Sequence, residues 1–581
     1  MKKLFIQLLA ISLFLSGCSQ VNPKEEQAKF DEFIQEEFVE SMESNYINMH
    51  TFLENPKKFG IEEKPDVTVG EPLNNETLGE IREDIKESKK EFSKFHRDSL
   101  NKNQKVIYDS YQYMLDVNES LSNQKFDDLS IVFSSMSGIH TQLPTLFTDF
   151  TIRNEQDIKD EIQLMKSVRP YIKSLLEYTK RQETKGTLML DIDAVVEYCE
   201  NVIDHRENSG ILVGLNESVD ALDIPDSQKE SYKQQIKDVF MADFIPSYED
   251  IVDTMSKLDH TKNNEQGLCQ LKNGRSYYEL LFKQTTGTDR SIKDIKKQLA
   301  ADAIQSIQEV QSMISSNPRL FEQYANNEFL TNYDSYESIL KDLENDFQQD
   351  FPKVNKIEYS IKPISKDIAS DGVVAYFNLP PIDDTGKKQI RMNTLEDTLN
   401  MQDVSTFTTV AHEGIPGHMY QTAYLYENMS TPWQKTESDF LGYVEGYATY
   451  VELYSVKYLE NLTERQMKFI QDMKVIQNSV IALLDIGIHY DGWDYNEASN
   501  FMDSMGMVMS QELYKQIQSN PTAFLPYYVG YSELNRFKEK AMKELGSGFE
   551  EMEFHKAILK DGIVPFSIVE MNVDKYIKNN V

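Results

Sequence analysis

The chain has 581 residues, of which 40% are hydrophobic, 27% charged and 11% aromatic, as in a globular protein that can bury a large core. Its 95 acidic residues outnumber 60 basic ones and give a formal net charge of −35. This charge argues against nucleic acid as a partner, because nucleic-acid binding needs a basic surface, and against an electrostatic grip on anionic lipid.

The N-terminus has the pattern of a bacterial lipoprotein signal over residues 1–18. Two lysines precede an apolar segment over residues 4–15, which is too short to span a bilayer. The segment ends in Leu-Ser-Gly-Cys, which resembles a lipobox, and Cys18 is the predicted lipidation site. Residues 19–26 follow as a polar tether. We expect an exported protein that lipid alone anchors to the extracytoplasmic face of the cell membrane; an ordinary secretory signal or an uncleaved anchor is the alternative.

The pattern of residues 27–350 predicts a series of helices. Residues 30–38 carry apolar side chains at i, i+3, i+4 and i+8, the spacing of one helical face. Breakers such as Asn55-Pro56 separate the helical segments. Similar patterns cover residues 76–120, 155–205, 228–256, 291–315 and 336–350. We therefore expect a helical N-terminal region without internal repeats, in which Cys199 and Cys269 are buried and free.

Residues 351–581 carry the candidate chemistry, and we expect them to form one compact unit with the N-terminal region. Four prolines between residues 352 and 381 rule out one long helix at the start of this region. Three segments have the pattern of short strands, at residues 356–361, 372–378 and 388–393. The sequence therefore predicts a small sheet here.

The sequence His-Glu-Gly-Ile-Pro-Gly-His at residues 412–418 places two imidazoles around a carboxylate. In the His-Glu-x-x-His zinc helix, the two His bind metal from positions i and i+4, and the Glu is the general base. Here the second His stands at i+6, about 120° further round a straight helix. Pro416-Gly417 can absorb the extra residues, through a bulge or through two short helices that meet at Pro416. Either arrangement brings His412 and His418 onto one ion, whereas an ordinary pair of surface or core histidines is the alternative.

A third ligand is predicted on a mostly apolar, aromatic helix that follows. Glu445 and Glu452 stand at i and i+7, on one face of that helix. A buried acid on such a face needs a partner or a metal, whereas an exposed one is simply solvated. Two His and Glu445 would leave the fourth position of a zinc ion open, as in catalytic sites. Zinc suits this ligand set best, and the set also admits manganese or iron.

The motif at residues 412–418 and the later Glu445-Gly-Tyr-Ala resemble the bacterial domain-of-unknown-function-885 family, which is grouped with the gluzincin metallopeptidases. The chain departs from the family pattern at Met419, where a second His is frequent, and at Tyr447, where Trp is frequent. The resemblance covers most of the mature chain and includes residues 274–278, 485–489, 526–530, 536, 545–546, 554–555 and 562–565. It implies a mainly α fold, with a large helical body around a deep cleft and a small sheet beside a zincin-like metal helix.

The resemblance also implies roles for residues around the metal. Gluzincins use a Tyr or His to donate to the developing oxyanion, and Tyr527 is the first candidate and Tyr531 the second. In zincins an edge strand holds the substrate by main-chain pairing. That would place the substrate strand near Gln389–Asn393, with Arg391 and Asn393 as substrate-binding residues; a surface hairpin is the alternative.

Two further residues are candidates on their own chemistry. His489 stands four residues after Asp485, so the two can orient each other or the zinc ligands; a satisfied core histidine is the alternative. Arg536 can bind a substrate carboxylate bidentately, or form an ion pair with an acid such as Glu533.

Together these features predict an exported, lipid-anchored zinc metallopeptidase that acts on peptides or oligopeptides, with Glu413 as general base. One alternative is a non-catalytic helical surface lipoprotein. Another is a metal-dependent hydrolase of a non-peptide amide or ester. Glu413 between two intact histidines favours an enzyme, because a binding protein does not need the base.

Overall fold

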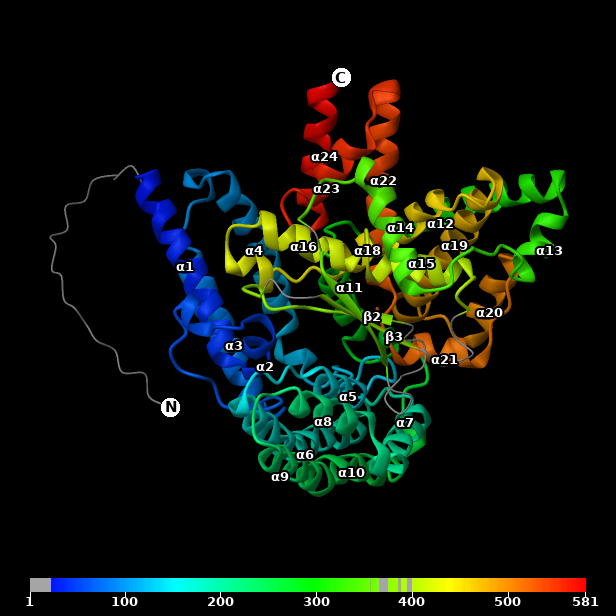
Figure 1. Ribbon diagram of the computed structural model, residues 1–581. Helices are drawn as coiled ribbons and strands as arrows, with labels where there is room; N and C mark the ends of the chain where they lie inside the picture. Colours follow the sequence, from blue (N-terminus) through cyan, green and yellow to red (C-terminus); the bar gives the residue numbers. More distant parts are fainter. Residues whose placement is uncertain (1–21, 356, 365–374, 385–387, 394–399) are drawn as a thin grey trace.

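The computed structural model describes residues 22–355, 357–364, 375–384, 388–393 and 400–581 (Figure 1). The predicted lipidation site, Cys18, lies outside these residues. The described chain is helical over most of its length and has one small sheet, which confirms the predicted mainly α fold. In the part of the chain that is described, no helix is both long and apolar enough to cross a bilayer.

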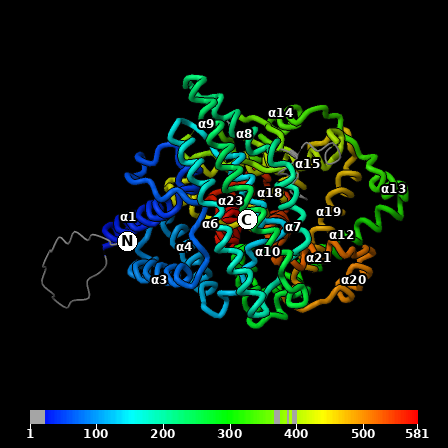
Figure 2. Tube along the Cα trace, turned by 90° about the horizontal axis from the view of Figure 1, so that it is seen from below, coloured from blue at the N-terminus to red at the C-terminus, as the bar shows by residue number. Residues whose placement is uncertain are grey.

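Helices α1–α10 form the N-terminal region, and α6–α10 lie together along one side of the molecule (Figures 1 and 2). The apolar spacing predicted in α1 is confirmed, because Phe30, Ile34 and Phe38 are all buried. The helices are α1 (Pro23–Ser44), α2 (Tyr46–Phe52), α3 (Asn75–Phe92), α4 (Lys102–Leu121), α5 (Ile139–Asp149), α6 (Glu155–Lys185), α7 (Ile192–Asp204), α8 (Gly210–Asp220), α9 (Asp226–Val239) and α10 (Ile245–Met255).

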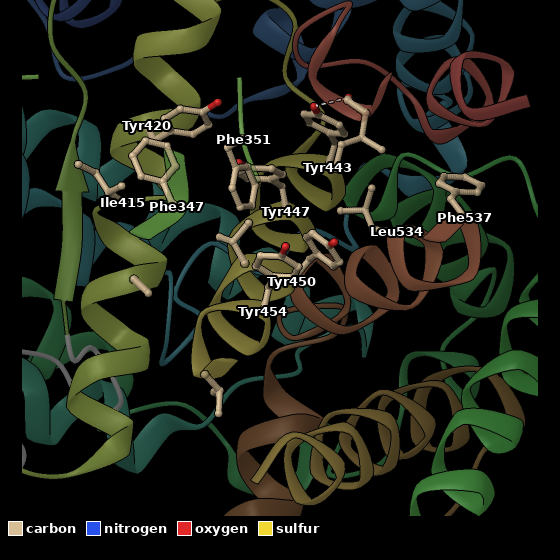
Figure 3. Close-up of a cluster of buried hydrophobic side chains, with 14 of the residues drawn as sticks. Phe347, Phe351, Ile415, Tyr420, Tyr443, Tyr447, Tyr450, Tyr454, Leu534 and Phe537 are labelled. Carbon is tan, nitrogen blue, oxygen red and sulfur yellow. Dashed lines mark hydrogen bonds between the residues drawn. The ribbon is translucent and has the colours of Figure 1, made fainter. Parts of the chain in front are cut away.

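Helices α11–α24 form the rest of the molecule. Their largest hydrophobic core includes side chains of α12–α14, and the buried clusters contain residues from both sides of residue 350. A run of tyrosines on α18 lies at the centre of this core (Figure 3). The helices are α11 (Gly274–Thr286), α12 (Ile292–Ser316), α13 (Arg319–Ala325), α14 (Tyr336–Asp346), α15 (Val404–Glu413), α16 (His418–Asn428), α17 (Pro432–Thr436), α18 (Leu441–Ser455), α19 (Glu464–Ile486), α20 (Tyr495–Ser504), α21 (Gln511–Ser519), α22 (Leu525–Leu545), α23 (Glu551–Leu559) and α24 (Phe566–Asn580).

The sheet has three strands, β1 (Tyr359–Ile364), β2 (Ala375–Asn378) and β3 (Lys388–Asn393), in the order β1-β3-β2. Strand β3 pairs in parallel with β1 and antiparallel with β2. Ile390 and Met392 of β3 are buried in the main core, which includes side chains of α14 and α15.

The prediction that β3 is the edge strand is therefore wrong. Its main chain is paired on both sides and is not open to a substrate. The physical reason is burial: Ile390 and Met392, two residues apart, point to one face of the sheet and fix β3 over the core. Among the described strands, the edge that reaches the site is β2.

Candidate metal centre

The two predicted histidines lie at the junction of two short helices. Helix α15 ends at Glu413 and α16 begins at His418, so the second of the two expected arrangements is the one observed. The junction needs glycine at residue 417, because a Cβ there would lie 1.8 Å from the carbonyl oxygen of His412. From α18, the Tyr447 hydroxyl donates a hydrogen bond of 3.0 Å to the carbonyl of Pro416 and so anchors the turn.

The structure brings His412, His418 and Glu445 together. Each offers one ligand atom, and these atoms all lie within 4.8 Å of one another. Oε2 of Glu445 lies 3.5 Å from Nε2 of His412 and 3.3 Å from Nε2 of His418. This oxygen is buried and has no hydrogen-bond partner of good geometry among the described residues. A buried carboxylate oxygen between two imidazole nitrogens fits a divalent metal ion, because the three donors converge and the oxygen is otherwise unsatisfied.

The electrostatics of the centre favour a cation. Burial tends to raise the pKa of Glu445, but His418 and His412 outweigh it and hold this pKa well below its usual range. Burial tends to lower the pKa of His412, but hydrogen bonds to Glu445 and Glu452 outweigh it and raise this pKa. The carboxylates therefore stabilise positive charge at this point, whether it belongs to a proton or to a metal ion.

Glu452 is a functional candidate to which the sequence analysis gave no role. Its Oε2 lies 3.3 Å from Nδ1 of His412, on the other side of the ring from Glu445. Lys474 lies 3.7 Å from the second oxygen of Glu452. Burial alone would raise the pKa of Glu452, but Lys474 and His412 have the larger effect and lower this pKa below its usual value. The group is therefore held as a carboxylate. The signal was its position seven residues after Glu445, on the same helical face.

Glu413 is buried beside the candidate ligands without being one of them. Burial raises the pKa of its carboxyl group, whereas His418 and His412 oppose this rise. A hydrogen bond from the backbone of Phe377, in the edge strand β2, also lowers the pKa. Glu413 therefore lies between the two histidines and the edge of the sheet.

A cavity of about 1460 Å³ opens in front of these residues. Its walls come from both the N-terminal region and the rest of the chain, which agrees with the deep cleft that we expected. Its lining includes His412, Glu413, His418, Glu445 and Tyr527.

Tyr527 lies over the candidate ligands. Its ring stacks on that of His412, with 6.2 Å between centroids and 23° between planes. Burial, and then the charges of Glu445 and Glu413, raise its pKa, so its hydroxyl keeps its proton and can donate it in a hydrogen bond. Helices α18 and α22 meet backbone to backbone near this point, because a Cβ on Gly446 would lie 2.4 Å from Cα of Gly530. This close crossing brings Tyr527 to the ligands.

His489 lies apart from the centre, in the core. Its Nδ1 accepts a hydrogen bond from the backbone N–H of Leu268, and its Nε2 donates to the carbonyl of Ile517. Burial lowers its pKa to about 4. Asp485 instead accepts hydrogen bonds from the Tyr278 hydroxyl and the Thr522 N–H. His489 is thus the satisfied core histidine of our alternative, since neither of its nitrogens is free to act.

The remaining candidates do not line the cavity. Arg536 forms ion pairs with Glu533 and Glu570, each at 2.9 Å, so both terminal nitrogens of its guanidinium already contact carboxylates. This observation corrects the prediction that it binds substrate and supports the ion-pair alternative. Tyr531 packs against the main core, and burial raises its pKa.

Of the two predicted substrate residues of β3, Arg391 does not line the cavity, and the side chain of Asn393 lies outside the described part of the chain. Arg391 contacts Asp149 of α5, with 2.8 Å between Nε and Oδ1, and so ties the sheet to the N-terminal region. Asn393 ends β3 and is paired in register with Ile364 of β1.

The model of a family described as bacterial protein of unknown function (DUF885) matches residues 57–573. No curated protein matches the chain. A solved structure of a candidate lipoprotein from Colwellia psychrerythraea is similar over 96% of this chain and 99% of its own, with a TM-score of 0.79 and 16% identity. A candidate lipoprotein of unknown function from Shewanella oneidensis is similar over 94% and 99%, with a TM-score of 0.62 and 14% identity. At these identities, the two likenesses concern the fold alone.

Proposed function

We propose that this chain, which belongs to the DUF885 family of bacterial proteins of unknown function, is a metal-dependent peptidase. The observation that carries the proposal is the convergence of His412, His418 and Glu445 within 4.8 Å, with Glu413 buried beside them in a large cavity. A ligand triad alone also suits a structural ion. The buried base and the open cavity favour catalysis, because a structural site needs neither.

His412, His418 and Glu445 would hold one ion, and zinc suits these ligands best. When bound, zinc supplies a Lewis acid that lowers the pKa of a water molecule toward neutrality. Glu452 would accept the Nδ1 proton of His412, which would leave Nε2, on the side of Glu445, available to hold the ion.

Glu413 takes a proton from the attacking water on its carboxylate and later passes that proton to the leaving amine. Its raised pKa makes it a stronger base than an exposed glutamate. Tyr527 donates its hydroxyl hydrogen to the carbonyl oxygen of the substrate as negative charge develops there. The outer edge of β2, whose residues Ala375, Tyr376 and Phe377 line the cavity, pairs with the substrate main chain beside the hydrogen bond from Phe377 to Glu413.

We also propose that the protein is exported and anchored by lipid at Cys18. The lipobox pattern at residues 15–18 supports this anchor. Two solved structures with the same fold are described as candidate lipoproteins, which agrees with it.

A peptide-library digest tests the peptidase proposal. The purified protein is incubated with the library before and after treatment with a chelator, and again after zinc is restored. We expect cleavage that the chelator abolishes and zinc restores. Cleavage that resists complete metal removal, or a lack of cleavage by the zinc-loaded protein, would contradict the proposal.

A further inference from the structure

A loop of the N-terminal region, residues 127–138, forms part of the cavity wall. Ser134, in this loop, donates a hydrogen bond to Oδ1 of Asn520, in the segment that precedes α22. Nδ2 of Asn520 donates in turn to Oγ of Ser135, at 2.9 Å. Ser134 and Asn520 both line the cavity, so this contact joins the two parts of the chain at the cavity wall.

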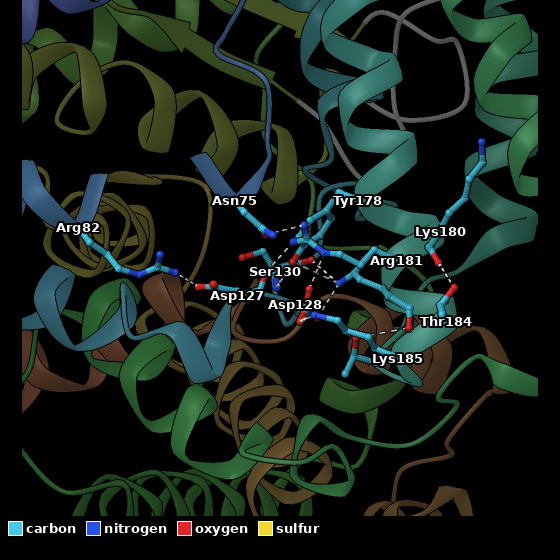
Figure 4. A network of polar contacts seen from close by, with 12 residues as sticks. Asn75, Arg82, Asp127, Asp128, Ser130, Tyr178, Lys180, Arg181, Thr184 and Lys185 are labelled. Carbon is cyan, nitrogen blue, oxygen red and sulfur yellow. Dashed lines mark hydrogen bonds and ion pairs between the residues drawn. The ribbon is translucent and has the colours of Figure 1, made fainter. Parts of the chain in front are cut away.

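The base of this loop is fixed to α3 and α6 (Figure 4). Asp127 forms an ion pair with Arg82, and Asp128 forms ion pairs with Arg181 and Lys185, at 2.7 and 2.6 Å. Gln182 donates to the carbonyl of Ser130, at 3.0 Å. Ion pairs and a hydrogen bond therefore fix the N-terminal end of this loop, which forms part of the cavity wall.

The sheet forms another part of the cavity wall. The hydroxyl of Tyr376, in β2, donates a hydrogen bond of 2.6 Å to Asp149 of α5. The N–H of Ile382 donates to the carbonyl of Phe52, the last residue of α2, at 2.8 Å. Tyr376 and Phe52 line the cavity, so these contacts again lie at its wall.

A further contact lies beyond the N-terminal end of α18. Ser41 of α1 donates a hydrogen bond of 2.8 Å to Glu437, which also lines the cavity. Contacts between the N-terminal region and the rest of the chain therefore occur at the wall beside the loop, beside the sheet and beside α17. The candidate metal ligands lie within these walls.

We infer that the cavity accepts short, flexible peptides and excludes folded proteins; this inference rests on the proposed peptidase function. The volume of about 1460 Å³ exceeds the roughly 300–1000 Å³ of most small-ligand pockets, so the cavity has room for several residues of a peptide. A folded domain of 100 residues has a radius of gyration of about 13 Å and cannot enter. An extended chain adds about 3.5 Å per residue, so the residues of a long peptide that do not fit in the cavity must extend out of it between the walls.

The test uses one cleavage sequence, identified in the library digest, in several hosts. Peptides of about 5 to 40 residues carry it at their centre, and a small folded protein carries it in an exposed loop. Cleavage rates are measured with the zinc-loaded full chain. Binding of the same fluorescent substrates is measured with Glu413→Gln, so that length dependence has a readout separate from turnover.

We expect kcat/KM to fall by at least about tenfold between the short and the long peptides, with a parallel loss of binding, and we expect no cleavage of the folded host. Equal rates and equal binding for all hosts would overturn the inference while leaving the peptidase proposal intact. If the zinc-loaded protein cleaves none of the peptides, the proposed function fails and the inference fails with it.

A substitution at the cavity wall tests whether the wall itself limits the length of the substrate. Asn520→Ala removes the hydrogen bonds that join the loop to the segment before α22, and it should narrow the difference between short and long peptides. Asn580→Ala removes a side-chain bond near the C-terminus and serves as the matched control, with an unchanged ratio. A ratio that Asn520→Ala also leaves unchanged would count against this wall as a size limit.

Discussion

Oε2 of Glu452 lies 3.3 Å from Nδ1 of His412, while Glu445 faces Nε2 of the same ring. One helix, α18, thus supplies a carboxylate to each side of one imidazole, from positions seven residues apart. Glu445 is in place to share an ion with His412, and Glu452 is in place to orient the ring. Carboxylates that hold a ligating histidine in this way set its tautomer and its basicity.

Glu452→Gln should weaken zinc binding about 10- to 100-fold, because it removes the charge that holds the Nδ1 proton of His412. The amide keeps the size of the side chain, so the fold should persist. Zinc affinity is measured by competition with a chromophoric chelator, and circular dichroism checks the fold. Wild-type zinc affinity in a folded Glu452→Gln protein would show that Glu452 does not orient the ligand.

Gly446→Ala should destabilise the protein by about 1–3 kcal/mol, because its Cβ would lie 2.4 Å from Cα of Gly530 and force α18 and α22 apart. The same shift moves Tyr527 away from the ligands and should lower activity. Gly79→Ala is the matched control, since nothing lies within 4 Å of a Cβ at that helical position. It should leave activity unchanged and stabilise the protein by about 0.5–1 kcal/mol. Thermal unfolding measures the stability of both variants. Equal losses of stability in the two would show that the close contact of α18 and α22 at Gly446 does not limit the size of this residue.

Asp485 should make stability depend on pH. Burial raises its pKa to about 7 in the folded protein, although hydrogen bonds from Tyr278 and Thr522 oppose the rise. The unfolded chain releases this proton near pH 3.9, so between about pH 4 and pH 7 the folded state binds more protons than the unfolded state. The free energy of unfolding should therefore fall as pH rises through this window, by about 4 kcal/mol at most.

Asp485→Asn isolates this term, because His489 and the other groups titrate in both proteins. The difference in unfolding free energy, wild type minus variant, should decline from pH 4 to pH 7 and stay constant above that range. Denaturant unfolding at several pH values measures it. A difference that is constant from pH 4 to pH 8 would mean that Asp485 ionises at its ordinary pKa in the folded protein.

Cys18→Ser should prevent lipidation, and the protein should then be released or keep its signal segment. Cell fractionation and electrophoretic migration measure both outcomes. Deletion of residues 19–22 is a useful control, since it shortens the polar tether and leaves the lipobox intact. If Cys18→Ser fractionates and migrates like the wild type, the proposed anchor is wrong.

The convergence of the candidate ligands could be predicted because most of the pattern is local. His412, Glu413 and His418 stand in one short motif, and Pro416-Gly417 marks where the helix must break. The sheet could not be ordered from sequence, because three short strands carry no signal of which one pairs on both sides. The alternating burial of Ile390 and Met392 suits a strand over the core, whereas the resemblance to zincins had placed the substrate edge at this strand.

The residues that were misplaced owe their positions to distant partners. His489 is satisfied by the backbone of Leu268 and Ile517, which lie 221 and 28 residues away along the chain. Arg536 meets Glu570, 34 residues away, on a helix that packs beside its own. Spacing within one helix cannot reveal such contacts, so the sequence left a functional and a structural role open for each of these two residues.

The central claim is that Glu413 is the base and that Glu445 is a metal ligand. Glu413→Gln keeps size and hydrogen bonding but cannot take a proton, so turnover should fall by about 10²- to 10⁴-fold while zinc binding persists. Glu445→Gln removes a charged ligand, so zinc binding itself should weaken.

The zinc content of the two purified variants, measured beside that of the wild type and with peptidase rates on the same samples, tests this claim most directly. The account predicts zinc near the wild-type level and little turnover in Glu413→Gln, and reduced zinc in Glu445→Gln. Loss of zinc from Glu413→Gln with retention in Glu445→Gln would reverse the two roles. Wild-type hydrolysis by both variants would contradict the account, because the activity would then lie elsewhere.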